Sequence, residues 1–329
     1  MSEDAIEAGA EGRSETDPGT ASPNSGEAIG SGRKCGFIAI IGAPNAGKST
    51  LVNHLVGAKV TIVSRKVQTT RTPVRGIAIV DQSQLVFIDT PGIFRPKRRL
   101  DRAMVEAAWG RAGEADVVGL LVDAAKGIDA DVGRILEKSE GLGHRRILIL
   151  NKVDRIGEKE RLLQLIDEVS RKASFERVFM ISALKGSGVG DLKSYLAEAV
   201  PEGPWHYPED DITDLPMRAL ASEITREKIF DRLHQELPYA TTVETTSWQE
   251  RKDGSVRIEQ TIFVERDSQR QIVLGQGGQT IKLISMESRK ELLGIVERPV
   301  HLFLFVKVRE GWGNDPERYR EMGLEFPKE

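Results

Sequence analysis

The chain has 329 residues, 39% of them hydrophobic, which is long enough for two domains with ample cores. A single cysteine, Cys35, excludes an intramolecular disulfide and fits a reducing compartment. No apolar run approaches the roughly 20 residues that span a bilayer, and the acidic N-terminus is unlike a signal or transit peptide.

The net charge of −3 is unevenly distributed along the chain. Residues 1 to about 33 carry seven acidic side chains and hardly any apolar ones, so we expect a disordered tail. Residues 35–203 hold 26 basic and 20 acidic side chains, whereas residues 204–329 hold 18 and 23. Bulk charge therefore gives no argument that the C-terminal half binds nucleic acid.

The first motif follows the apolar run 37–41 and reads Gly42-Ala43-Pro44-Asn45-Ala46-Gly47-Lys48-Ser49. A buried strand that leads into G-x-x-x-x-G-K-S predicts a phosphate-binding loop, in which backbone N–H groups surround the α- and β-phosphates. Lys48 is expected to reach the β- and γ-phosphates, and the Ser49 hydroxyl to bind Mg²⁺. The helix that begins near Thr50 would add its positive N-terminus. A glycine-rich turn with a surface lysine is the alternative, which the flanking strand and helix disfavour.

The second motif, Asn151-Lys152-Val153-Asp154, follows the buried run 147–150 and points to guanine. The Asp154 carboxylate can accept hydrogen bonds from the guanine N1–H and amino group, and adenine offers no such pair of donors. Lys152 would lie along the base and Asn151 would brace the loop. Ser182 and Ala183, after the run 178–181, can supply a backbone N–H to the guanine O6.

The third motif, Asp89-Thr90-Pro91-Gly92, ends the apolar run 85–88. Asp89 is expected to hold Mg²⁺ through water, and the Gly92 N–H to contact the γ-phosphate. A helix cap is the alternative for this turn alone. Three nucleotide motifs in the expected order, each at the end of a strand, predict GTP binding.

Two features bear on hydrolysis. Ile93 stands where Ras-like enzymes have the glutamine that orients the attacking water, so intrinsic hydrolysis should be slow. With Asn45, the loop resembles that of potassium-stimulated GTPases, which implies that Asn45 helps to hold a K⁺ ion. The alternative is that Asn45 only tolerates the turn geometry of the loop. In the hydroxyl-rich segment 64–72, Thr70, or else Thr69, is expected to cover Mg²⁺ and the γ-phosphate.

Alternating elements predict an α/β fold for the N-terminal half: a P-loop GTPase with a mostly parallel six-stranded sheet. Strands are expected near 37–41, 75–80, 84–89, 117–123, 146–150 and 178–181, and helices near 49–56, 101–112, 129–141, 158–172 and 189–199. The second and third strands form a hairpin. Residues 201–216, with four prolines and five acids, are the linker.

Beyond the linker the pattern predicts an α+β domain. We expect a helix at 218–237, strands at 241–247 and 256–264, a short helix at 269–274, a helix at 280–293 and a strand at 300–308. Between the last two helices lies Gly275-Gln276-Gly277-Gly278. A G-x-x-G in this setting is typical of KH domains, which clamp single-stranded RNA, although a helix-turn-helix explains it nearly as well.

From Cys35 to Glu329 the sequence closely resembles the bacterial Era GTPases, which join a Ras-like domain to a type II KH domain. The specific echoes are segments 64–71, 221–228, 236–239 and 299–312. The resemblance implies a Ras-like domain at 34–203, a linker at 204–216 and a KH domain with a C-terminal extension at 217–329. It also implies binding to the 3′ end of 16S rRNA, a function in 30S subunit assembly, a monomer, and a cytoplasmic location with loose association at the inner membrane.

The resemblance places RNA contacts at the loop 275–278, with Arg270, Lys282 and Arg289 nearby. One departure is Gly277, where the family usually has a basic residue, so backbone N–H groups would do more of the clamping. The competing function is a GTP-dependent protein- or membrane-docking regulator of the cell cycle. A basic cluster after Gly92 (Arg95, Lys97, Arg98, Arg99 and Arg102) either couples nucleotide state to domain orientation or is a solvated surface.

Overall fold

The computed structural model describes residues 32–64, 66, 68–158, 160–233 and 237–327. Almost all of the expected acidic tail lies outside this range, as do Arg65 and Val67 of the hydroxyl-rich segment and Glu236 of one family echo. Within the described ranges, no helix is both long enough and apolar enough to cross a membrane.

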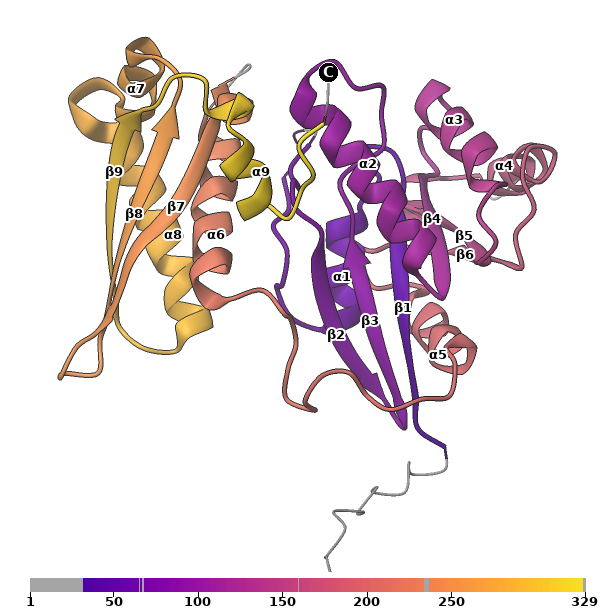
Figure 1. Ribbon diagram of the computed structural model, residues 1–329. Helices are drawn as coiled ribbons and strands as arrows, with labels where there is room; N and C mark the ends of the chain where they lie inside the picture. The colour runs from indigo at the N-terminus through magenta and orange to yellow at the C-terminus, as the bar shows by residue number, and fades with distance from the viewer. Residues whose placement is uncertain (1–31, 65, 67, 159, 234–236, 328–329) are drawn as a thin grey trace, which may run out of the picture. The chain divides into compact units, whose positions relative to one another are not determined.

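Six strands of the N-terminal half form one sheet in the order β2-β3-β1-β4-β5-β6 (Figure 1). All neighbouring pairs are parallel except β2 and β3, which form the expected antiparallel hairpin. The strands are β1 Lys34–Ile41, β2 Val74–Val80, β3 Ser83–Asp89, β4 Val117–Asp123, β5 Arg145–Asn151 and β6 Arg177–Met180. The predicted P-loop GTPase sheet is therefore confirmed.

Helices cover both faces of this sheet, which is why β3 and β4 are buried along their whole length. On one face, α1 Lys48–Val56 and α5 Val189–Ala199 pack into one hydrophobic cluster. On the other face, α2 Arg99–Glu114, α3 Ala130–Ser139 and α4 Glu160–Ser170 form the second cluster. Because the central strands are parallel, the polar residues that follow β1, β3, β4 and β5 meet at one edge.

The linker contains no long element, but it follows the N-terminal sheet closely. Its residues form isolated bridges with β1 and β2, at Lys34–Glu202 and Gly76–Thr213. The Ile77 N–H donates to the Ile212 carbonyl at 2.9 Å. The linker therefore covers part of β2, which would otherwise be an open edge.

The C-terminal half contains a three-stranded sheet in the order β7-β8-β9, with β7 and β8 antiparallel and β8 and β9 parallel. Its elements are α6 Met217–Arg232, β7 Thr241–Glu250, β8 Val256–Val264, α7 Asp267–Leu274, α8 Gln279–Val296 and β9 Val300–Val308. The helices pack on one face of the sheet through two hydrophobic clusters. This is the predicted α+β arrangement.

Two elements differ most from the sequence expectation, while β7 and α8 each extend three residues past their expected ends. Helix α6 ends at Arg232 instead of Leu237, and Leu237–Ala240 form the 3₁₀ turn η2 around Pro238, which cannot continue a helix. A short helix, α9 Pro316–Glu321, was not expected. Tyr319 and Leu324 pack against Ala103 and Met104 of α2. Further 3₁₀ turns are η1 Val153–Arg155, η3 Gln276–Gly278 and η4 Trp312–Asn314.

Candidate nucleotide-binding site

A cavity of about 580 Å³ lies at the carboxyl edge of the large sheet, within the size range of small-molecule sites. The β1–α1 loop, residues 62–64 and 68–70, and the turn after β3 line it. Asp123, Lys126, Lys152 and Arg155 complete the wall. The structure thus brings the phosphate loop, the Asp89 turn and the Asn151 loop to one cavity.

The glycines of the first loop are required by close approaches of the backbone. At Gly47, where φ is +105°, an added Cβ would lie 2.4 Å from Asn151 Nδ2. At Gly42 it would lie 2.3 Å from the Leu121 carbonyl oxygen. Asn45 also takes a left-handed φ of 60°, which asparagine tolerates better than most residues. The turn geometry alone therefore favours asparagine at this position.

Lys48 is a buried cation whose hydrogen-bond acceptors are neutral. Its side chain is 6% exposed, and Nζ donates to the carbonyls of Gly42 and Ala43, each at 3.1 Å. Burial lowers the pKa of Lys48 to about 8, and the nearby Asp89 raises it only in part. A phosphate placed here would favour the charged amine.

Asp89 is fully buried and gathers three hydroxyl groups. Its Oδ2 accepts hydrogen bonds from Ser49 and Thr61, both at 2.8 Å, and from Thr70 at 3.1 Å. Burial raises the pKa of the Asp89 carboxyl, and Lys48 and these hydroxyls counter the rise in part. Its Oδ1 has no hydrogen-bond partner in the part of the chain that the structure describes.

These oxygens fit a magnesium ion. A carboxylate and hydroxyls are the hard ligands that Mg²⁺ prefers, and the unpartnered Oδ1 leaves capacity for a water or an ion. Among the described residues, no group of three or more His, Cys, Asp or Glu side chains offers another metal site. Thr61 was missed by the sequence analysis because no motif surrounds it.

The two threonines of the hydroxyl-rich segment differ in their hydroxyl contacts. Thr70 Oγ1 lies 3.0 Å from Ser49 Oγ and also contacts Asp89. Thr69 Oγ1 instead donates to the Lys66 carbonyl at 2.9 Å. Thr70 is therefore the threonine of the Ser49–Asp89 group.

Asn151 joins the phosphate loop to the turn after β6. It is 2% exposed; Nδ2 donates to the Ala46 carbonyl at 2.8 Å, and Oδ1 accepts the Ala183 N–H at 2.9 Å. The Ala183 N–H is one of the two backbone groups expected to contact the guanine O6, and it is engaged with Asn151. The other, the Ser182 N–H, donates to the Ser187 carbonyl at 2.9 Å. Lys152 Nζ donates to the Asn45 carbonyl at 2.6 Å and to Asp123 at 2.7 Å.

Asp154 is held in its ionised form. A hydrogen bond from the Ser182 hydroxyl is the largest cause that lowers the pKa of Asp154, and Lys185, at 3.9 Å, adds to it. An ionised carboxylate accepts hydrogen bonds only, which is what recognition of two guanine donors requires. Asp123, which the sequence analysis did not select, was visible as the polar end of the apolar run 117–122.

Ile93 is part of the hydrophobic core. Its side chain is 6% exposed and belongs to the cluster on the α2 face, while its N–H donates to the Gly42 carbonyl at 3.0 Å. At Gly92 an added Cβ would lie 3.0 Å from Pro44, so glycine lets the Asp89 turn rest on the phosphate loop. The side chain at position 93 therefore cannot orient a water.

The G-x-x-G loop lies between α7 and α8. Gly275, Gly277 and Gly278 all have positive φ values of 73°, 58° and 76°. A Cβ at Gly275 would lie 2.2 Å from Thr280 Oγ1, whereas one at Gly277 meets nothing within 4 Å. Position 277 therefore has room for a side chain, but glycine adopts its left-handed backbone without strain. Gln276 and Gly277 are exposed, as are Arg270, Lys282 and Arg289.

Comparison with known proteins decides the family. A model for 50S ribosome-binding GTPases matches residues 37–152, and a KH-domain model matches residues 236–313. The GTPase Era of Bradyrhizobium sp. (strain ORS 278) is 65% identical over 296 residues, which cover 90% of this chain and 96% of that protein. The GTPase Era of Sinorhizobium medicae (strain WSM419) is also 65% identical, over 90% of this chain and 95% of its own. The chain belongs to the Era GTPase family.

Solved structures agree with this assignment. An Era crystal structure with MgGDPNP and nucleotides 1506–1542 of 16S ribosomal RNA matches with a TM-score of 0.84 and 39% identity, over 88% of this chain and 99% of that one. A point variant of Aquifex aeolicus Era bound to GDP·AlF₄⁻ matches with a TM-score of 0.83, at the same identity and coverage. The expected GTPase activity and the Era resemblance are thus confirmed, as is the combination of a P-loop GTPase fold with a KH domain.

Proposed function

We propose that this Era-family GTPase binds the 3′ end of 16S rRNA through the loop 275–278, prefers RNA in its GTP state, and acts in assembly of the 30S subunit. The related Era seen with this RNA and MgGDPNP supports the proposal, since it shares 39% identity over 88% of the chain. The observation that carries it is the exposed loop with three glycines at positive φ, which leaves backbone open to a phosphate chain.

Charge near the loop is suited to a phosphate backbone. Lys282 and Arg289 lie on one exposed face of α8, with Met286 between them at helical spacing. Lys282 is in the first turn of the helix, next to the loop. Arg270 on α7 is exposed, although it lies 3.3 Å from Asp267. Residues 266–298 carry six basic and four acidic side chains, a local excess within a net-acidic domain.

We assign the nucleotide roles as follows. The loop Gly42–Ser49 and Thr50 hold the phosphates, Lys48 keeps a proton against them, and the Thr90–Gly92 turn presents the Gly92 N–H to the γ-phosphate. Ser49, Thr70 and Asp89, the last through water, hold Mg²⁺, which supplies positive charge to the phosphate oxygens. Asp154 selects guanine. The Ala183 N–H, which donates to Asn151, would either form a bifurcated hydrogen bond with the guanine O6 as well or leave the O6 to another backbone N–H of that turn.

Hydrolysis should be slow because Ile93 is buried and cannot orient water. We propose that K⁺ bound with help from Asn45, or a partner, accelerates it. The proposed division is a Ras-like domain at 34–203, a linker at 204–216 and a KH domain with an extension at 217–329. The family resemblance supports a monomer that is cytoplasmic and loosely associated with the inner membrane.

RNA binding can be tested with two matched glycine variants. Gly277 and Gly254 both have positive φ, and a Cβ at either meets nothing within 4 Å, but Gly254 lies in the β7–β8 turn. With a fluorescent RNA of the 16S 3′-end sequence, Gly277→Asp should weaken binding by roughly tenfold, about 1.4 kcal/mol, because it places an anion in the clamp.

Gly254→Asp should bind the RNA as the wild type does, and a scrambled RNA should bind poorly to both. The GTP-analogue complex should bind more tightly than the GDP complex. Equal binding by the Gly277→Asp variant would contradict the assignment of the loop. Failure of the wild type to prefer the 16S sequence would favour the protein- or membrane-docking regulator.

A further inference from the structure

We propose that Glu227, on helix α6 of the KH half, is a positioning residue of the nucleotide site: it holds one wall of the cavity in place and slows nucleotide release. This goes beyond RNA binding, because it concerns how the C-terminal half controls the GTPase site. The wall consists of residues 59–64, of which Ile62, Val63 and Ser64 line the nucleotide cavity.

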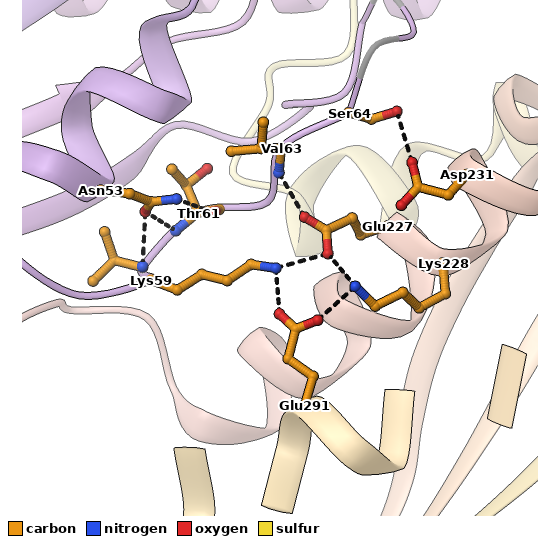
Figure 2. Close-up of polar contacts among 10 residues, drawn as sticks. Asn53, Lys59, Thr61, Val63, Ser64, Glu227, Lys228, Asp231 and Glu291 are labelled. Atoms are coloured by element: carbon orange, nitrogen blue, oxygen red, sulfur yellow. Dashed lines mark hydrogen bonds and ion pairs between the residues drawn. The ribbon is translucent and has the colours of Figure 1, made fainter. Parts of the chain in front are cut away.

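The wall is held from the GTPase side by Asn53 on α1 (Figure 2). Asn53 Oδ1 accepts the N–H groups of Val60 and Thr61 at 2.9 and 3.0 Å, and its Nδ2 donates to the Thr61 carbonyl at 2.8 Å. Thr61 in turn reaches Asp89. Hydrogen bonds thus connect one side of the wall to the proposed magnesium ligand Asp89.

Glu227 holds the other side. Its Oε1 accepts the Val63 N–H at 2.8 Å, and its Oε2 accepts Lys59 Nζ at 2.7 Å, so this one carboxylate contacts both ends of the wall (Figure 2). The residue is only 3% exposed. Burial acts to raise the pKa of Glu227, but the hydrogen bonds from Lys228, Lys59 and Val63 outweigh it, so the pKa lies below its usual range and the group stays ionised.

A second carboxylate extends this contact to the helix that follows the G-x-x-G loop. Glu291 of α8 pairs with Lys59 and with Lys228, so two lysines and two glutamates form a balanced cluster across α6, α8 and the wall (Figure 2). Further contacts join α6 to this part of the chain: Ser64 Oγ donates to Asp231 at 3.4 Å, Arg226 donates to the Thr69 carbonyl at 2.6 Å, and Lys66 Nζ donates to the carbonyls of Phe230 and Leu233.

The buried position of Glu227 makes its contribution larger than that of a surface ion pair. Removing the charge leaves the Val63 N–H and Lys59 with a weaker acceptor inside the protein, and such losses exceed those at exposed pairs. The wall would then open more often, and a nucleotide beneath it would leave faster.

The test is the release rate of fluorescent GDP from the full chain. Glu227→Gln should release GDP about tenfold faster than the wild type. The matched control is Glu287→Gln, which removes an ion pair between the same two helices, Arg232–Glu287, that does not reach the wall. It should release GDP within about twofold of the wild type.

A charge reversal at the partner of Glu227 gives a second test. Lys59→Glu should accelerate release, because the new carboxylate faces Glu227 and Glu291. Should Glu227→Gln fail to fold, Lys59→Met gives the same test at a partly exposed side chain. The proposal is overturned if the folded Glu227 or Lys59 variant releases GDP at the wild-type rate, or if Glu287→Gln releases it as fast as Glu227→Gln does. Whether the wild type binds GDP at all tests the nucleotide site itself, independently of the role of Glu227.

Discussion

Lys48 is the buried cation on which phosphate binding depends, and its proton is linked to that binding. In the free protein burial lowers the pKa of Lys48 to about 8, so the amine is partly neutral above this pH. Phosphates favour the charged form and raise the pKa again.

We therefore predict that GDP binding takes up protons between pH 8 and 10.5 and takes up none through Lys48 well below pH 8. At pH 9 the uptake should approach about one proton, and affinity should fall as pH rises beyond 8. Calorimetry in two buffers with different ionisation enthalpies measures the uptake directly. A binding enthalpy that does not depend on the buffer at pH 9 would contradict the pKa shift.

Asn45 offers a test of potassium stimulation that leaves the loop intact. Because Asn45 takes a left-handed φ of 60°, Asn45→Gly keeps the backbone unstrained while it removes the amide. We expect this variant to bind GDP normally but to hydrolyse GTP at equal rates in K⁺ and Na⁺, whereas the wild type should be faster in K⁺. If K⁺ still accelerates hydrolysis in the variant, Asn45 serves only the turn geometry and does not hold K⁺.

Among single residues, the sequence predicts those site residues that belong to a local motif. Lys48, Asp89 and Asn151 stand at fixed positions beside apolar runs, so their meeting at one edge follows from a parallel sheet. Thr61 and Glu227 lie in no motif, and the Val63–Glu227 hydrogen bond joins residues 164 positions apart. Such contacts depend on packing between distant segments, which one sequence does not reveal.

The loop between α7 and α8 is constrained at its first glycine. A Cβ at Gly275 would clash with Thr280 Oγ1 at 2.2 Å, whereas Gly254, with a similar positive φ, has open space around it. Gly275→Ala should therefore lower the free energy of unfolding by more than Gly254→Ala, which costs only left-handed strain of about 1–2 kcal/mol.

Urea denaturation of the two variants gives the difference, which combines the clash with Thr280 and the strain of the Gly275 backbone, whose φ of 73° and ψ of 171° are almost confined to glycine. RNA binding by Gly275→Ala should also fall, since the loop must shift to admit the methyl group. Equal losses of stability in the two alanine variants would show that the loop relaxes freely.

Most elements could be predicted because their burial leaves a clear pattern. Strands β3 and β4 are buried on both faces and appear as continuous apolar runs. Helix α9 has six residues, too few for a helical period to be visible, and its burial comes from contact with α2. The end of α6 was misplaced because its sequence stays helix-compatible up to the turn around Pro238.

Besides the apolar packing of Tyr319 and Leu324 on α2, several contacts between the two halves are polar, and hydrophobic patterning does not predict those. Arg71 is 5% exposed and donates to the carbonyls of Pro238, Tyr239 and Thr241, and its guanidinium lies 5.6 Å from the Trp312 ring. Burial lowers the pKa of Arg71, the neighbouring Arg226 lowers it further, and Glu223 opposes the shift. The segment that carries Thr70 is thus held by the KH half on one side and by Asp89 on the other.

In the whole molecule, we expect RNA bound to the KH half to change the rate of GTP hydrolysis in the GTPase half. This coupling is measured as the rate of GTP hydrolysis by the full chain, with and without a short single-stranded RNA of the 16S 3′-end sequence, in K⁺ and in Na⁺. We predict stimulation by this RNA and not by a scrambled one, with the higher rates in K⁺. An unchanged rate at RNA concentrations that saturate binding would show that the RNA does not act on the GTPase half.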